Sequence, residues 1–113
     1  MTPPPTAEDV LDRFARSRAL FTALGDERRQ TIIVLLLRAG EALSVNDIAA
    51  RLELSQPAAS HHLKILRDAG LLTVERKGTQ RRYALNAAEY PERLAPLGEL
   101  VELITACAAA PHA

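Results

Sequence analysis

The polar side chains of one predicted helix have the types and spacing needed to contact the edges of DNA bases. Ser55 is a typical N-cap, and Pro57 in the first turn costs little because an N–H at that position has no helical partner. Small and amide side chains near a helix start can reach bases in the major groove, and Gln suits adenine. An ordinary solvent-facing helix surface is the alternative. The predicted recognition-helix contacts are Ser55, Gln56, Pro57, Ser60, His61 and Lys64.

The cationic side chains that follow this helix are spaced as in a β-hairpin. After Gly70 the apolar period changes from 3.6 to 2, and a turn is predicted at 77–80. Cations on such a tip suit phosphates or the narrow minor groove of DNA. Charge that protects a hairpin edge from aggregation is the alternative, although it explains one or two cations better than four. The predicted contacts of this hairpin, called the wing, are Arg76, Lys77, Gly78, Thr79, Gln80, Arg81 and Arg82.

The charge of the chain is unevenly distributed although the formal net charge is zero. Residues 51–85 carry seven Lys or Arg and three Asp or Glu, a balance of +4. Residues 1–50 have a balance of −1, and residues 86–113 have a balance of −3. The positive field therefore lies on the helix and the wing, where a polyanion would be bound.

Two further helices are predicted ahead of this segment. Thr6 and Asp9 resemble a capping box, and the apolar stripe that follows runs as one helix to Gly25. Asp26 is expected to cap a second helix that extends to Ala39. That helix has too many apolar residues for one narrow stripe, so we expect it to be the central and most buried one.

A short third helix leads into the helix that begins at Ser55. Ser44 and Asp47 predict another capping box, and a tight connection at 53–54 joins the two helices as a helix-turn-helix. After the wing a last helix is predicted from about Ala87, with an irregular front part because of Pro91 and Pro96. The inner face of the helix after Ser55 is expected to give the core Ala59, Leu63 and Leu66.

These elements predict a mainly α fold with a small β-hairpin, a winged helix-turn-helix of order α-α-α-α-β-β-α. At 113 residues the chain has the size of one domain, predicted at residues 7–110 between a flexible, Pro-rich tail at 1–6 and a tail at 111–113. A chain this short buries only about two thirds of its unfolded surface, so a second copy that covers an apolar face would stabilise it.

Several classes of protein are excluded by what the sequence lacks. The longest apolar run, Ile32 to Leu37, is far shorter than the roughly 20 residues of a membrane span, and the N-terminus does not resemble a signal peptide. A single cysteine, Cys107, fits a reducing compartment, so a cytoplasmic location with no membrane partner is predicted. No Gly-rich phosphate loop or nucleophile–base pair is present, so no enzyme is predicted, and His62 is expected to be half-buried and structural.

With these residues in place, the chain resembles the ArsR/SmtB family of winged helix-turn-helix repressors over about residues 19–86. The segment ALFTALGDERRQTIIVLLLRAG is similar to the family's opening pattern, and SQPAASHHLKILRDAGLL and the wing follow in the family's order. By motif position, Gln56, Ser60 and His61 match base-facing residues, whereas Pro57 departs from a more frequent Ser. The resemblance implies a homodimer formed chiefly by the first and last helices, which places these residues at the interface: Val10, Phe14, Phe21, Leu94, Leu97, Val101 and Ile104.

The metal sites for which this family is known are not matched. Ser44 and Asn46, in ALSVNDI, stand where the thiolate ligands of the family belong, and the last helix offers glutamates but no histidine apart from His112. Neither a metal site nor a cofactor is therefore predicted. Cys107 is typical of a small packing residue, and a redox role would need a bridge between two subunits or a sulfenic acid.

Taken together, the residues predict a sequence-specific regulator of transcription that binds double-stranded DNA. The expected form is a homodimeric repressor on an inverted-repeat operator, either constitutive or released by a small molecule or a partner protein. The alternative is a winged-helix module that binds another protein and binds DNA weakly or not at all. The sequence does not identify the operator, the target genes or an inducer, and it does not separate a repressor from an activator.

Overall fold

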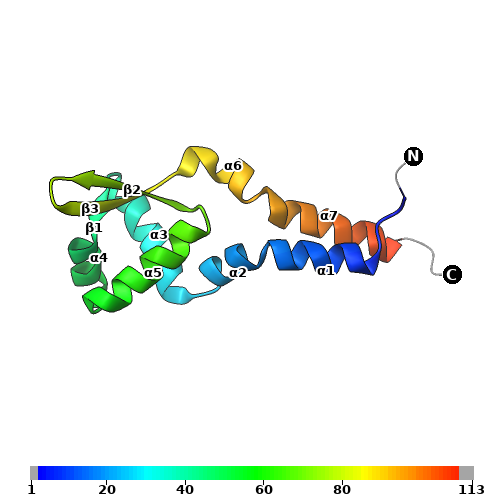
Figure 1. Cartoon of the computed structure of the whole chain (residues 1–113), viewed down its shortest axis with the longest axis horizontal. Helices are drawn as coiled ribbons and strands as arrows, with labels where there is room; N and C mark the ends of the chain where they lie inside the picture. The colour runs from blue at the N-terminus through cyan, green and yellow to red at the C-terminus, as the bar shows by residue number, and fades with distance from the viewer. Residues whose placement is uncertain (1–2, 110–113) are drawn as a thin grey trace.

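A computed structural model describes residues 3–109 and has the predicted winged helix-turn-helix architecture (Figure 1). The molecule is elongated, 60 × 24 × 21 Å, with a head and an arm. The head contains α3 (Glu27–Ala39), β1 (Leu43–Ser44), α4 (Val45–Leu52), α5 (Gln56–Asp68), β2 (Leu72–Lys77) and β3 (Gln80–Leu85). The arm contains α1 (Ala7–Arg16), α2 (Arg18–Leu24) and α7 (Ala95–Ala109), and η1 (Ala87–Glu89) and α6 (Tyr90–Arg93) connect the wing to α7.

The helix boundaries follow the capping residues that the sequence predicts. Thr6 and Asp9 form a reciprocal capping box at the start of α1. Asp26 accepts from the N–H groups of Arg28 and Arg29 and so caps α3, which ends at Gly40 with φ +66°. Ser44 Oγ accepts from the Asp47 N–H at 3.1 Å and Ser55 Oγ from the Ala58 N–H at 3.2 Å, so both members of the helix-turn-helix begin as predicted.

The predicted first helix is divided into two at Ser17. Its backbone leaves the helical region there, with φ −95° and ψ 0°, and Arg18 begins α2. The two parts pack on different partners, since α1 lies along α7, whereas α2 contacts α3 and α5 and buries Leu20 and Ala23 in the head. They stay nearly in line (Figure 1), and the Ser17 N–H still donates to the Arg13 carbonyl at 3.0 Å.

The wing belongs to a three-stranded antiparallel sheet of order β1-β3-β2 rather than to an isolated hairpin. Leu43 and Ser44 pair with Tyr83 and Arg82 of β3. The predicted hairpin and its turn are confirmed, since the chain reverses between Lys77 and Gln80, and Val74 lies opposite Tyr83. Gly78 in this turn has φ +66°, a conformation that glycine adopts without steric cost.

The core is made by the inner faces of all the head elements together with α2. The expected burial of Ala59, Leu63 and Leu66 is confirmed. The expectation that the second predicted helix is the most buried is wrong, because Val34 and Leu37 of α3 are exposed and α5 has more buried residues. The core cluster contains Leu20, Ala23, Ile32, Leu36, Leu43, Ile48, Leu63, Leu66, Leu71, Leu72 and Tyr83.

The last helix has the irregular front part that its prolines predict. The 3-10 turn η1 and the single turn α6 precede α7, Pro91 lies in the first turn of α6, and α7 begins at Ala95 with Pro96 next. Of the predicted tails, residues 3–6 lead into α1 without regular structure, and residues 1–2 and 111–113 lie outside the described residues. None of the helices in the described part is long and apolar enough to cross a membrane.

Candidate nucleic-acid interface

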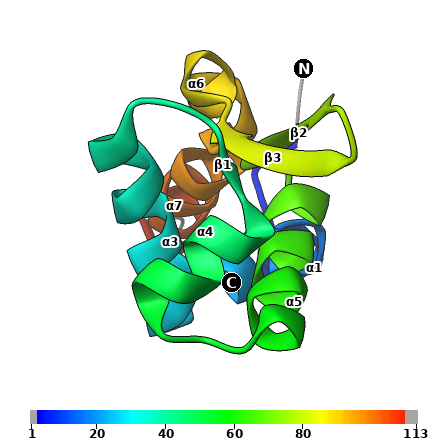
Figure 2. The same cartoon turned by 90° about the vertical axis from the view of Figure 1, so that its left-hand side faces the viewer.

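A groove of about 780 Å³ lies between α5 and the wing. Figure 2 looks at the end of the head and shows α4 and α5 toward the viewer with the hairpin beside them. The groove brings together two sets of predicted contact residues that are far apart in the sequence. From α5 it is lined by Gln56, Ser60 and Lys64, and from the wing by Thr79, Gln80 and Arg81.

The remaining predicted contact residues do not line the groove. Ser55 caps α5 with its side chain, and Pro57 and His61 are exposed on α5 but do not line the groove. On the wing, Arg76, Lys77, Gly78 and Arg82 also lie outside its lining. The groove therefore brings six of the predicted contact residues together, and the other predicted contacts lie outside its lining.

Some groove residues are absent from the predicted set. Ser44, Val45 and Asn46 line the groove because β1 pairs with β3, and a two-residue strand has no periodic signal in the sequence. Tyr83 lines the groove as well, although the alternation of the hairpin indicates only that it faces the core. Arg67 lines the groove too, as its position on the same helix face as Gln56, Ser60 and Lys64 indicates, although it is not among the predicted contacts.

One groove residue is acidic and changes the electrostatics of α5. Asp68 Oδ2 lies 2.7 Å from Lys64 Nζ in an exposed (i, i+4) ion pair. Such pairs add little to stability, but this one offsets the charge of Lys64 at the groove. Arg67 and Arg81 form no ion pair within residues 3–109, so they supply the uncompensated positive charge of the groove.

The wing holds two arginines directly opposite each other. Arg76 pairs with Arg81 across β2 and β3, on the same side of the hairpin as Val74 and Tyr83, which face the core. Like charges at opposed positions repel and destabilise a hairpin, so this pair is unfavourable in isolation. A bound anion would relieve the repulsion. Protection of an edge from aggregation does not require this pairing, because cations anywhere on the strand would provide it.

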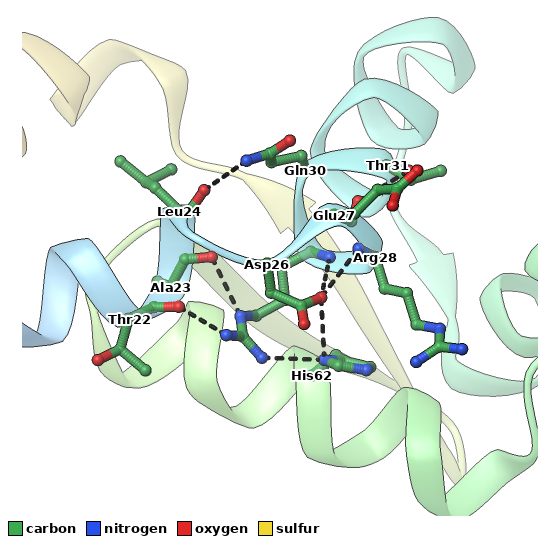
Figure 3. Close-up of polar contacts among 10 residues, drawn as sticks. Thr22, Ala23, Leu24, Asp26, Glu27, Arg28, Gln30, Thr31 and His62 are labelled. Atoms are coloured by element: carbon green, nitrogen blue, oxygen red, sulfur yellow. Dashed lines mark hydrogen bonds and ion pairs between the residues drawn. The ribbon is translucent and has the colours of Figure 1, made fainter.

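A buried polar cluster holds α5 against the arm and α3 (Figure 3). Arg29 is only 8% exposed. Its guanidinium donates to the Ala23 carbonyl at 3.1 Å and to the Thr22 carbonyl at 2.6 Å, both at the end of α2. Its Nη1 lies 3.1 Å from His62 Nδ1 on α5. The predicted structural role of His62 is therefore confirmed, but the side chain is 8% exposed and so is buried rather than half-buried as predicted.

The contact with Arg29 determines the protonation state of His62. Arginine can only donate, so His62 Nδ1 must accept and the ring must be neutral with its proton on Nε2. Burial lowers the pKa of His62, and the charge of Arg29 lowers it further against the opposing effect of Asp26, whose Oδ1 lies 4.0 Å away. Burial raises the pKa of Asp26, but the N–H groups of Arg29 and Arg28 hold it below the usual range.

Comparison with known proteins identifies the family. Residues 26–74 match the family described as bacterial regulatory protein, arsR family. The arsenical resistance operon repressor of Bacillus subtilis is 44% identical over 84 residues, which cover 74% of this chain and 76% of the relative. The transcriptional activator HlyU of Vibrio cholerae is 35% identical over 86 residues, which cover 76% and 78% of the two chains. The chain belongs to the ArsR family.

The solved structures agree with this assignment. A homodimeric winged helix-turn-helix DNA-binding domain from Mycobacterium bovis matches with a TM-score of 0.59 at 27% identity, covering 100% of this chain and 97% of that one. The resemblance and the fold class inferred from the sequence are confirmed. This ArsR-family chain is a transcriptional regulator and not an enzyme.

In this ArsR-family member, the positions compared above with the thiolate site have other roles. Ser44 is buried and caps α4, and Asn46 is exposed at the start of α4 and lines the groove. Across the described residues, no three His, Cys, Asp or Glu side chains lie close enough together to hold a metal ion.

The Arg29–His62 contact predicts how stability depends on pH. Because the folded-state pKa of His62 lies below its ordinary value of 6.5, its contribution to stability is complete above pH 6.5 and is lost as the pH falls through the folded-state pKa. The free energy of unfolding should fall by at most about 1.4 kcal/mol per pH unit in this window, since one proton is taken up. Urea unfolding at pH 7.5, 6.5 and 5.5 measures this slope.

Two variants assign the slope to His62. His62→Asn keeps an acceptor near the position of Nδ1 and removes the titration, so its stability should vary less with pH than that of the wild type. His61→Asn changes the exposed neighbour and should retain the wild-type slope. An equal slope in wild type and His62→Asn would show that other groups cause the dependence.

Proposed function

We propose that this ArsR-family regulator is a homodimeric repressor that binds an inverted-repeat operator, with α5 in the major groove and the wing on the flanking backbone. The groove between α5 and the wing is the observation that carries the proposal, because it joins amide and hydroxyl groups to uncompensated arginine charge. The M. bovis relative is a homodimeric DNA-binding domain. Repression is favoured by the name of the B. subtilis relative, although HlyU is named an activator.

In this proposal the polar groups of α5 read bases and the wing binds phosphates. Gln56 and Ser60 reach base edges, with His61 and Lys64 beside them, and Ser55 and Pro57 set the start of the helix. The wing contacts, Arg76, Lys77, Gly78, Thr79, Gln80, Arg81 and Arg82, follow the backbone or enter the minor groove. The opposed arginines of the hairpin support this role, since a phosphate between them would relieve their repulsion.

The dimer is proposed to form through the arm, within a single domain at residues 7–110. Phe14, Phe21, Val101 and Ile104 leave between 41% and 64% of their surface exposed, and Leu11 beside them is 69% exposed. Phe14 and Phe21 lie with ring centroids 6.0 Å apart, so they offer one continuous aromatic surface. Val10 is half-buried, and Leu94 and Leu97 already pack against the core of their own chain, so the exposed four would contribute most of the contact.

We further propose that no thiolate metal site controls this protein. The Ser44 hydroxyl is used as a helix cap, and the oxygen and amide groups of Ser44 and Asn46 are poor ligands for soft metal ions. An inducer, if one acts, would be a small molecule or a partner protein, and the protein would need no cofactor. A cytoplasmic location follows from this function.

Binding to DNA from the region upstream of the protein's own gene tests the function directly. Fluorescence anisotropy at physiological salt should give at least about 1,000-fold tighter binding to an inverted repeat than to random duplex. Equal affinity for both would contradict the proposal. The alternative, a winged-helix module for a protein partner, predicts negligible DNA binding even at low salt, where phosphate contacts are strongest.

Two single variants separate base reading from phosphate binding. Gln56→Ala should lose about 1–3 kcal/mol of discrimination at one base pair of each half-site, with a small change on random DNA. Arg81→Ala should weaken binding to all sequences similarly and reduce the slope of log K against log salt by about one for each phosphate that is no longer neutralised. Anisotropy titrations over a salt series measure both, and the proposed roles would be wrong if the two variants behaved alike.

A further inference from the structure

Side-chain hydrogen bonds join the segment between the wing and the arm to the end of α5. Asn86 Nδ2 donates to the Gly70 carbonyl at 2.7 Å, and the Tyr90 hydroxyl donates to the Leu71 carbonyl at 2.8 Å. The Arg93 side chain lies over Gly70, where an added Cβ would be 3.2 Å from its Cδ. We call Asn86, Tyr90 and their two acceptor carbonyls the clamp.

The clamp lies where the main chain gives little rigidity of its own. Gly70, with φ +81°, ends α5, and the chain from the wing to α7 passes through a 3-10 turn and a single helical turn. Pro91 and Pro96 interrupt this connection, and Leu94, between α6 and α7, has φ −98° and ψ −2°. A continuous helix would be stiff by itself, whereas this connection depends on side-chain contacts to hold its direction.

The Tyr90 hydroxyl is well suited to this task. A tyrosine phenol has a pKa near 10 and is therefore a protonated donor at physiological pH, and burial raises the pKa of Tyr90 further. Its acceptor is the carbonyl of Leu71, a fully buried core residue that directly follows Gly70. The bond therefore connects α6 to the point at which α5 ends and β2 begins.

We propose that Tyr90, together with Asn86, is a positioning residue that fixes the angle between α5 and the dimer arm and thereby sets the half-site spacing that the dimer accepts. This inference rests on the proposed function. In a dimer held by its arms, the separation of the two recognition helices depends on how each head is fixed to its own arm. Over the 60 Å length of the molecule, a tilt of about 3° moves one end by about 3 Å, close to the rise of about 3.4 Å per base pair.

The role of the second connection between α5 and the arm is different. Arg29 joins the middle of α5 to the end of α2 through His62, but it is buried and satisfies two carbonyl groups. Its removal would change the stability of the whole head. Tyr90→Phe removes one oxygen atom and keeps the ring, so it alters the clamp with little disturbance of the packing.

Half-site spacing is the measurement that separates positioning from simple stability. The operator is the tightest duplex that the wild-type protein selects from a random pool, and base pairs are then inserted or deleted one at a time between its half-sites. For the wild type we expect each change of one base pair to weaken binding by about tenfold or more. For Tyr90→Phe, the loss of affinity for each inserted or deleted base pair should be at least about threefold smaller than in the wild type, and it should be smaller still when Asn86→Ala is added. The affinity for an isolated half-site should stay unchanged in both variants.

A matched variant controls for the loss of one hydroxyl group. Thr31→Val removes an O–H donor that contacts the Glu27 carbonyl at 2.9 Å within α3, away from the clamp and the arm. For Thr31→Val, the loss of affinity for each inserted or deleted base pair should equal that of the wild type. Circular dichroism confirms that each variant is folded at the assay temperature, and the single Tyr90→Phe variant decides the question where the double variant unfolds.

The outcomes distinguish this inference from the proposed function. If the wild-type protein binds all duplexes with equal affinity, both the proposed function and the positioning role of Tyr90 are overturned. A spacing preference that the wild type and Tyr90→Phe share to within about twofold overturns only the positioning role. A variant that loses affinity equally for every spacing and for the isolated half-site also overturns it, because the clamp would then serve stability alone.

Discussion

Replacing Val101 with Glu is expected to convert the protein from a dimer into a monomer and to weaken binding to an inverted-repeat operator at least about 100-fold. Val101 is 64% exposed on α7, one helical turn from Ile104, and these two residues, like Phe14 and Phe21, are exposed apolar side chains of the arm. A carboxylate buried in such an interface has no partner charge, so association would cost several kcal/mol more. Sedimentation equilibrium measures the mass, and anisotropy measures the affinity.

A second glutamate variant provides the control for the change of charge. Ala106 is exposed on the side of α7 that already carries Glu99 and Glu102, roughly opposite the Val101–Ile104 stripe. Ala106→Glu should remain dimeric and should bind the operator with nearly the wild-type affinity. A dimeric Val101→Glu would show that the interface lies elsewhere, and the exposed apolar arm would then need another explanation.

The elements that position the candidate interface could be predicted because their signals are local. The caps Thr6, Asp26, Ser44 and Ser55 each satisfy N–H groups within three residues, so their pattern is visible in the sequence itself. The inward face of α5 follows in the same way, because a helix places residues three and four apart on one side. These features determine the start and the inward face of α5 without knowledge of the tertiary structure.

The missed features depend on contacts between distant segments. β1 exists because Leu43 and Ser44 meet β3, and no periodicity can develop over two residues. The division at Ser17, with φ −95° and ψ 0°, falls between a part that packs on α7 and a part that packs on the head, and the apolar stripe of the two parts is continuous in the sequence. Arg29 looks like any other charged residue near a helix start, and only the fold reveals that it is buried.

The site was predicted less completely than the elements that carry it. The groove is a property of the angle between α5 and the wing, and that angle is set by packing rather than by local sequence. His61 and Gln56 are both exposed on α5, yet only Gln56 lines the groove. A prediction based on one helix face includes both residues, because it carries no information on the position of the wing, which forms the other side of the groove.

Arg29→Ala is expected to lower the free energy of unfolding by about 2–4 kcal/mol, a large part of the stability of a domain of this size. The guanidinium donates to the carbonyls of Thr22 and Ala23 and contacts His62. Its removal leaves these acceptors without a partner inside the head and opens a cavity. The melting temperature should fall by about 10–20 °C, which differential scanning calorimetry measures.

The neighbouring arginine and a conservative variant identify the cause of this loss. Arg28 is exposed and forms no side-chain hydrogen bond or ion pair within residues 3–109, so Arg28→Ala should change stability by less than about 0.5 kcal/mol. Arg29→Lys keeps the charge near the end of α2 but cannot reach three acceptors in different directions. If Arg29→Lys were as stable as the wild type, charge beside the helix end would be sufficient. A loss close to that of Arg29→Ala would show that the directed hydrogen bonds of the guanidinium hold α2 and α5 together.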